Sequence, residues 1–84
     1  MVSTKAKRPS VDEYIAEIQG IIKRRYPDAE FTIMRRRRND VTMDVIGDFK
    51  NAYEVSKLVA DRTLDILLET GLFIIVVPID RDGR

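Results

Sequence analysis

Apolar residues are most continuous near the end of the chain, where residues 72–79 form an unbroken run that is rich in β-branched side chains. A short run of this kind is typical of a strand that is buried on both faces, and it is too short to cross a membrane. It follows a segment that ends at Gly71, a residue type that is common just after a helix. The pattern therefore predicts that a helix delivers the chain into a buried final strand.

A first helix is predicted over about residues 10–26, where apolar residues recur at helical spacing. Ser10 and Glu13 have the spacing of a capping box, in which each side chain bonds to the backbone of the other residue. Pro27 ends this helix, because proline cannot continue the hydrogen-bonding pattern.

A second helix is predicted over about residues 51–70, with Asn51 as its N-cap and Gly71 after its last turn. Its apolar arc is wider than one sheet-facing stripe requires. We therefore expect this helix to contact the sheet together with either the first helix or a second subunit.

Between the helices the pattern changes to alternation, which predicts strands near residues 30–37 and 41–47. A three-residue loop at residues 38–40 places Ile33 opposite Val45 and keeps the apolar residues of both strands on one face, whereas a two-residue loop would divide them. This apolar set comprises Phe31, Ile33, Val41, Met43 and Val45.

The elements therefore follow the order α-β-β-α-β. The last strand returns by a crossover to lie parallel to the second strand. This order predicts an α/β (α+β) two-layer sandwich, in which two antiparallel helices lie on one face of a three-stranded mixed sheet. Residues 1–8 are expected to form a flexible basic arm ahead of a single domain at residues 9–84.

The composition excludes several kinds of chemistry. The chain of 84 residues has neither cysteine nor histidine, so disulfides, thiolate nucleophiles, imidazole catalysis and the usual zinc ligands are absent. We therefore assign no catalytic, cofactor-binding or metal-binding residue and expect no cofactor. The N-terminus lacks an apolar signal region, so we expect a cytoplasmic protein without membrane contact. Few side-chain amides and many arginines are typical of thermophilic proteins.

Two clusters of cations are candidate contacts for an anion or a nucleic acid. They comprise Arg35, Arg36, Arg37 and Arg38 in the hairpin, and Lys23, Arg24 and Arg25 at the end of the first helix. The predicted topology places the two clusters at opposite ends of the molecule, because the first helix and the first strand run in opposite directions. The acids that this topology brings to the arginine run are Asp12, Glu13, Asp65 and Glu69. We therefore favour an internally paired surface over a nucleic-acid contact, and no aromatic residue interleaves the arginines.

Asp44 lies in an apolar strand that leads through Gly47-Asp48-Phe49 into a capped helix. Together with Glu69-Thr70-Gly71-Leu72, this segment resembles the second half of the small nucleotidyltransferase domains of the polymerase-beta superfamily, over about residues 41–80. The resemblance implies a Gly-Ser turn, an Asp-x-Asp pair and a third acid, which serve two metal ions and a nucleoside triphosphate. Asp44 matches the second acid of the pair, but Thr42 stands at the first and no Gly-Ser turn precedes it. The resemblance therefore implies a shared scaffold without a complete catalytic site.

Alternation in the last strand predicts a sheet face without a covering layer. Its odd-numbered and even-numbered residues point to opposite faces and both sets are apolar, yet two helices cover only one face. We therefore expect self-association, most simply as a twofold homodimer. The candidate interface residues are Met34, Ile46, Leu64, Leu68, Phe73, Ile75 and Val77.

These observations favour a non-catalytic α/β interaction module that self-associates. A nucleic-acid-binding accessory protein that uses the hairpin at residues 35–38 is the alternative, and a nucleotidyltransferase-like enzyme ranks third. As partners we expect a second copy of the chain, leave a different protein open, and rank nucleic acid below both.

Overall fold

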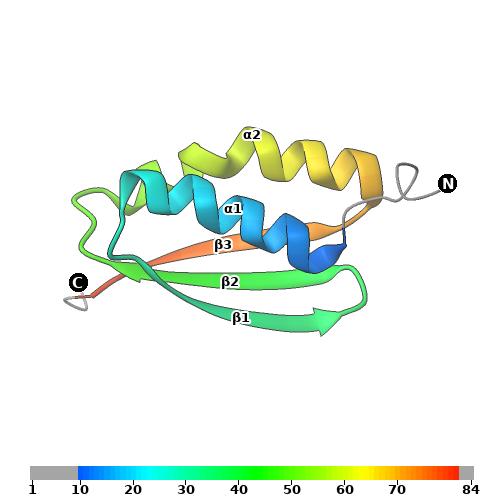
Figure 1. Ribbon diagram of the computed structural model, residues 1–84, viewed down its shortest axis with the longest axis horizontal. Helices are drawn as coiled ribbons and strands as arrows, with labels where there is room; N and C mark the ends of the chain where they lie inside the picture. The colour runs from blue at the N-terminus through cyan, green and yellow to red at the C-terminus, as the bar shows by residue number, and fades with distance from the viewer. Residues whose placement is uncertain (1–9, 82–84) are drawn as a thin grey trace, which may run out of the picture.

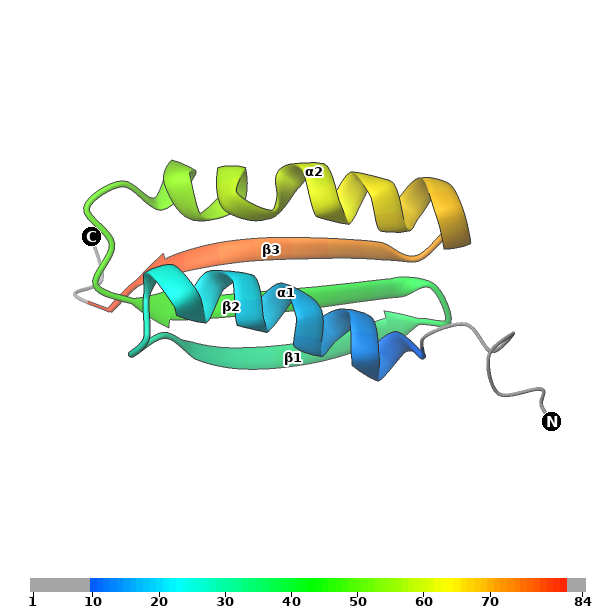
Figure 2. The same ribbon diagram turned by 45° about the horizontal axis from the view of Figure 1, so that its top comes forward.

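Two antiparallel helices lie side by side on one face of a three-stranded sheet (Figure 1 and Figure 2). The computed structural model describes residues 10–81, so the predicted basic arm at residues 1–8 lies outside the described residues. The elements are α1 Val11–Arg25, β1 Glu30–Arg37, β2 Asp40–Gly47, α2 Ala52–Thr70 and β3 Phe73–Asp80. This arrangement confirms the predicted two-layer sandwich and its element order.

β2 is the central strand of the sheet, whose strand order is β1-β2-β3. It pairs antiparallel with β1 through the hairpin, and parallel with β3 through the crossover that contains α2. The sheet is therefore mixed, as predicted. β1 and β3 each have one edge to which no strand of the described chain is paired.

Local capping groups set the ends of both helices. The Ser10 hydroxyl accepts a hydrogen bond of 3.2 Å from the Glu13 N–H, and the Glu13 carboxylate accepts one of 2.7 Å from the Ser10 N–H, which confirms the capping box. At α2 the Asn51 side chain accepts a hydrogen bond of 3.0 Å from the Tyr53 N–H. Gly71 ends α2 with a left-handed φ of 80°, a conformation that glycine adopts without strain.

The hairpin register differs from the prediction. Ile33 lies opposite Met43 rather than Val45, and the turn consists of Arg38 and Asn39 alone. The predicted three-residue loop is therefore wrong. The apolar residues of both strands nevertheless share the face toward the helices, where they join the core.

A β-bulge in β1 explains the difference. The register shifts by one residue between Arg35, which pairs with Val41, and Arg37, which pairs with Asp40. Arg36 is the additional residue on β1, and it restores the alternation that a two-residue turn alone would have broken. Hydrophobic periodicity could not reveal this, because a bulge followed by a shorter turn leaves the same apolar residues on the same face.

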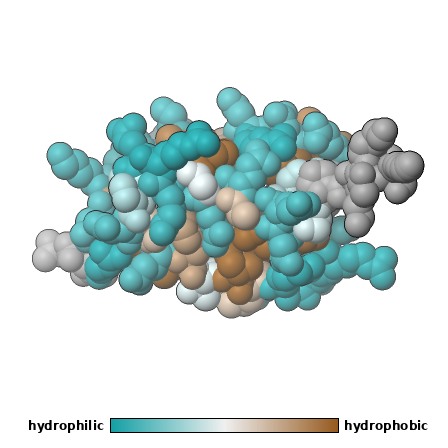
Figure 3. Space-filling model, viewed as in Figure 1, coloured by the Kyte–Doolittle hydropathy of each residue, from teal (hydrophilic) through white to brown (hydrophobic). Residues whose placement is uncertain are grey.

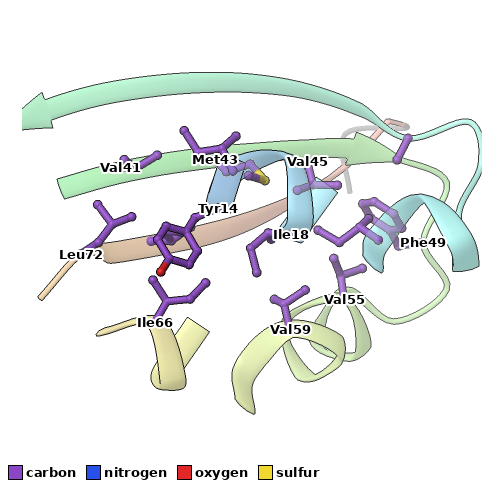
Figure 4. Packing of buried hydrophobic residues seen from close by; sticks show 14 residues of the cluster. Tyr14, Ile18, Val41, Met43, Val45, Phe49, Val55, Val59, Ile66 and Leu72 are labelled. Carbon is purple, nitrogen blue, oxygen red and sulfur yellow. The ribbon is translucent and has the colours of Figure 1, made fainter. Parts of the chain in front are cut away.

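The core lies between the helices and the face of the sheet that points toward them. Figure 4 shows labelled side chains of α1, β2 and α2 pointing toward one another in this layer. The fully buried side chains are Ile18, Ile22, Val41, Met43, Val45, Val55, Val59 and Ile66. The ring of Phe49 packs edge-to-face on Tyr26, with 5.0 Å between the ring centroids, and extends the core beyond the end of β2.

β3 is buried on one face only. Ile74 is 4% exposed, whereas Ile75, which points to the other face, is 40% exposed. The prediction of a strand buried on both faces is therefore wrong for the single chain, because the described residues supply one covering layer and not two.

Candidate functional site

The outer sheet face, which points away from α1 and α2, carries a row of apolar side chains along β3. We call this row the β3 stripe; it comprises Phe73, Ile75, Val77 and Ile79. Their exposed fractions lie between 36% and 46%. Contiguous apolar surface of this kind is uncommon on a single chain and is typical of an interaction site.

The same face continues over the two other strands. Thr42 lies opposite Ile75 on one side and opposite Met34 on the other, and Met34 is 48% exposed. Ile46 lies opposite Ile79 and is half-buried. The structure therefore brings the predicted interface residues of all three strands onto one surface.

Of the two predicted interface residues of α2, Leu64 lies beside the start of β3. Leu64 is 52% exposed and Leu68 is 75% exposed. A groove of about 140 Å³ between α2 and the start of β3 is lined by Thr63, Leu64, Leu67, Phe73 and Ile74. The apolar surface of α2 and the β3 stripe, which the sequence presents as alternatives, therefore adjoin at Phe73.

Hydrogen bonds show which residues of β3 face its free edge. The Phe73 N–H donates to the Asn39 carbonyl at 2.7 Å, and the Arg81 N–H donates to the Gly47 carbonyl at 2.8 Å. Backbone groups alternate in direction along a strand, so the odd-numbered residues of β3 bond to β2. The even-numbered residues direct their backbone groups to the free edge.

Proline weakens this free edge as a site for another strand. Pro78 directs its backbone there and has no N–H to donate. The Leu72 N–H, at the opposite end, already donates to the Thr70 hydroxyl at 3.0 Å. Within residues 72–79 only Ile74 and Val76 therefore present amide donors to an incoming strand, which is a common way to discourage edge pairing.

The arginine run has fewer acidic partners than the sequence predicts. Arg35 forms an ion pair of 3.7 Å with Asp12, and both side chains are largely exposed. No ion pair joins Arg36, Arg37 or Arg38 to any residue in the range 10–81. We call these three residues the arginine tip; hydrophilic side chains cover this hairpin end in the view of Figure 3.

Arg62 of α2 is paired with an acid of α1. Arg62 donates two hydrogen bonds to the Glu17 carboxylate, which joins α2 to α1. This hydrogen bonding raises the pKa of Arg62, and the charges of Glu69 and Asp65 raise it further. Asp65 and Glu69 form no ion pair with the arginine run within residues 10–81, so the expected pairing of these two acids with the run is not observed.

Lys23, Arg24 and Arg25 lie at the other end of the molecule, in the last turn of α1 (Figure 1). Arg25 lines an open groove of about 350 Å³ together with Tyr26, Glu54, Lys57 and Leu58. The prediction that the two basic clusters do not form one patch is confirmed, because α1 runs antiparallel to β1.

Asp44 lies on the outer sheet face, opposite Thr32 on β1 and Val77 on β3. Met34, which the predicted three-residue loop would place opposite Asp44, lies opposite Thr42 instead. Within residues 10–81, no group of three acidic, cysteine or histidine side chains is placed to hold a metal ion. The resemblance to nucleotidyltransferase domains stays a prediction.

No protein-family model, no curated protein and no solved structure matches this chain. In the part of the chain that the structure describes, no helix combines the length and apolarity needed to span a bilayer. The function must therefore be inferred from the outer sheet face and the arginine tip.

Proposed function

We propose that this chain is a cytoplasmic, non-catalytic α/β interaction module that self-associates through its outer sheet face. The observation that carries the proposal is the difference in exposure between the two faces of β3. Its residues are apolar on both faces, yet Ile74 is 4% exposed beneath the helices and Ile75 is 40% exposed on the opposite side. Water contact with the β3 stripe is unfavourable, and a second apolar surface removes it.

The outer sheet face offers a substantial apolar area to a dimer. Burying the β3 stripe with Met34 and Ile46 would remove on the order of 400 Å² of apolar surface per subunit, or about 10 kcal/mol before the costs of association. Thr32, on the edge strand β1, would lie at the rim, whereas Thr42, between Ile75 and Met34, would lie within the interface. Stable interfaces bury about 800 Å² per partner, so these apolar residues supply about half of the required area.

The position of the stripe favours one twofold arrangement. If the twofold axis lies in the plane of the interface and runs perpendicular to the strands, β3 of one subunit packs on β3 of the other. The two β3 strands then run in opposite directions. The β3 stripe then covers its own copy. An axis parallel to the strands would instead stack the stripe on β1, which presents Glu30 and Thr32. The first arrangement matches apolar with apolar surface, as an isologous interface requires.

Pairing through the edge of β3 is the less suitable route to a dimer. It would form a continuous six-stranded sheet, but Pro78 has no backbone N–H, and the Leu72 N–H already donates to the Thr70 hydroxyl. The β3 stripe would also remain exposed in such a sheet, because edge pairing covers no face. Face-to-face packing buries the stripe directly.

Sedimentation equilibrium at micromolar concentration tests the proposal. We expect the wild-type chain to exceed its monomer mass of 9.7 kDa, and the double variant Ile75→Glu with Val77→Glu to sediment as a 9.7 kDa monomer. Leu58→Glu is the matched control, because Leu58 is 37% exposed on α2, away from the outer sheet face. It should self-associate like the wild type. A wild-type chain that stays at 9.7 kDa at every concentration would refute self-association.

A further inference from the structure

We infer that the arginine tip and Phe73 together form a binding site for single-stranded nucleic acid. This site shares Phe73 with the β3 stripe, so self-association would cover part of it, and it is expected to act in the single chain. The sequence indicates only the arginines as a candidate contact, because the aromatic ring belongs to an element far from them in the chain.

The sheet register places an aromatic ring in the same row as an arginine. Asp40 pairs with Arg37 on one side and with Phe73 on the other, so the three residues share the outer sheet face. Strands are spaced about 4.8 Å apart, so the backbones of Arg37 and Phe73 are about 10 Å apart. Phe73 is 46% exposed, which leaves its ring accessible.

The hairpin holds these groups on a fixed backbone. The β-bulge at Arg36 and the two-residue turn present Arg37 and Arg38 at the end of the sheet. The Asn39 carbonyl accepts a hydrogen bond of 2.7 Å from the Phe73 N–H, which ties the turn to the start of β3. Figure 1 and Figure 2 both place the turn and the start of β3 at the same end of the molecule.

The charge at this end is available to a ligand. The arginine tip forms no ion pair with residues 10–81, and arginine binds phosphate through two parallel hydrogen bonds. Ser10 begins α1 at the same end, since Asp12 is paired with Arg35.

A flexible strand of alternating phosphates and exposed bases fits this combination. Its phosphates would contact the guanidinium groups, while one base stacks on the Phe73 ring, whose π face accepts any base. A duplex keeps its bases stacked inside and cannot use the ring. A lipid surface would need apolar residues at the turn, and residues 36–39 contain none. The site therefore favours single strands without reading their sequence.

Fluorescence anisotropy with labelled oligo-dT tests the inference, with a duplex of equal length as the comparison. We expect tighter binding of oligo-dT and a linear fall of log affinity with log salt concentration. Arg37→Ala with Arg38→Ala should lower the steepness of that fall by about 1.4, at about 0.7 for each phosphate contact. The matched control is Lys23→Ala with Arg24→Ala, which removes the same charge at the far end and should change neither quantity.

Two further variants test the Phe73 ring and the Asp40 carboxylate separately. Phe73→Leu keeps an apolar side chain for self-association but loses stacking, so oligo-dT affinity should fall on the order of 10-fold while sedimentation is unchanged. Asp40→Asn removes the carboxylate between Arg37 and Phe73 and should tighten binding. The site would be overturned if oligo-dT did not bind detectably. It would also be overturned if the arginine-tip variant and the Lys23→Ala with Arg24→Ala control lost equal affinity. Unchanged affinity in Phe73→Leu, or equal affinity for the duplex, would overturn the stacking role.

Discussion

The backbone N–H of Phe73 donates a hydrogen bond of 2.7 Å to the carbonyl oxygen of Asn39. This bond sets the start of the parallel pairing between β2 and β3, and it holds the hairpin turn against the strand that follows α2. It also brings the β3 stripe and the arginine tip together at one corner of the sheet. Both proposed surfaces therefore depend on the same register.

Amide hydrogen exchange should alternate along β3. The Phe73 and Arg81 amides are bonded to β2 and should be protected, whereas the Ile74 and Val76 amides face the free edge and should exchange faster. NMR-detected exchange at low protein concentration measures all four. Uniform protection along the strand would mean that another segment covers the edge of β3.

Raising the protein concentration distinguishes the two modes of self-association. Face-to-face packing supplies no new acceptor for the Ile74 and Val76 amides, so their exchange should stay fast relative to that of Phe73. Edge pairing would bond both amides to the second copy. Strong, concentration-dependent protection of Ile74 and Val76 would therefore contradict the proposed geometry.

Gly71→Ala should destabilise the chain, whereas Gly20→Ala should stabilise it. Gly71 has φ of 80°, and an alanine there would meet no atom within 4 Å, so its cost is purely conformational, at about 1–2 kcal/mol. Gly20 is exposed in α1, with open space around the added methyl group, so Gly20→Ala should stabilise the chain by about 0.5–1 kcal/mol. Urea denaturation measures both changes. Destabilisation by Gly20→Ala would mean that another group approaches α1 closely at this point.

Gly47 is required by the ring of Phe49. A methyl group at Gly47 would lie 2.9 Å from two ring carbons, and the ring is 7% exposed and packed on Tyr26. Gly47→Ala should therefore cost about 1–3 kcal/mol through overpacking, as measured by urea denaturation.

A double-mutant cycle tests this cause directly. Phe49→Leu removes the ring atoms that the methyl group would meet, so Gly47→Ala should cost much less in that background. An equal cost in both backgrounds would locate the effect in the backbone of Gly47 and would contradict the steric explanation.

Two methionines on opposite faces of the sheet report which face is covered. Met43 is fully buried beneath the helices, so Met43→Ala should destabilise the chain by about 2–5 kcal/mol. Met34 is 48% exposed on the outer sheet face, and Met34→Ala should change stability by no more than about 0.5 kcal/mol. Thermal or urea denaturation is compared at a concentration where the chain is monomeric. Equal costs would mean that a layer also covers the outer face.

Local interactions made the helices and the element order predictable from the sequence. The capping box at Ser10 and the left-handed Gly71 involve neighbouring residues, so the residue types and their spacing were sufficient to place them. Alternating apolar residues likewise placed the strands and the face of the hairpin that joins the core. The parallel return of the last strand followed from the length of its connection.

Contacts between distant residues decided the features that periodicity could not show. The bulge at Arg36 moved each hairpin residue to a different partner while it kept the apolar face intact. The bonding of Arg62 to Glu17 depends on how α2 packs on α1, which the periodicity of either helix could not show.

By itself, the sequence determined which residues are apolar, where the helices begin and end, and that one sheet face would lack a covering layer. Only the tertiary structure decided that this face includes the β3 stripe and that Phe73 shares a row with Arg37. Sequence periodicity reports the direction of each side chain within its own element. The neighbour of that side chain across the sheet is set by register, which hydrogen bonds between remote segments fix.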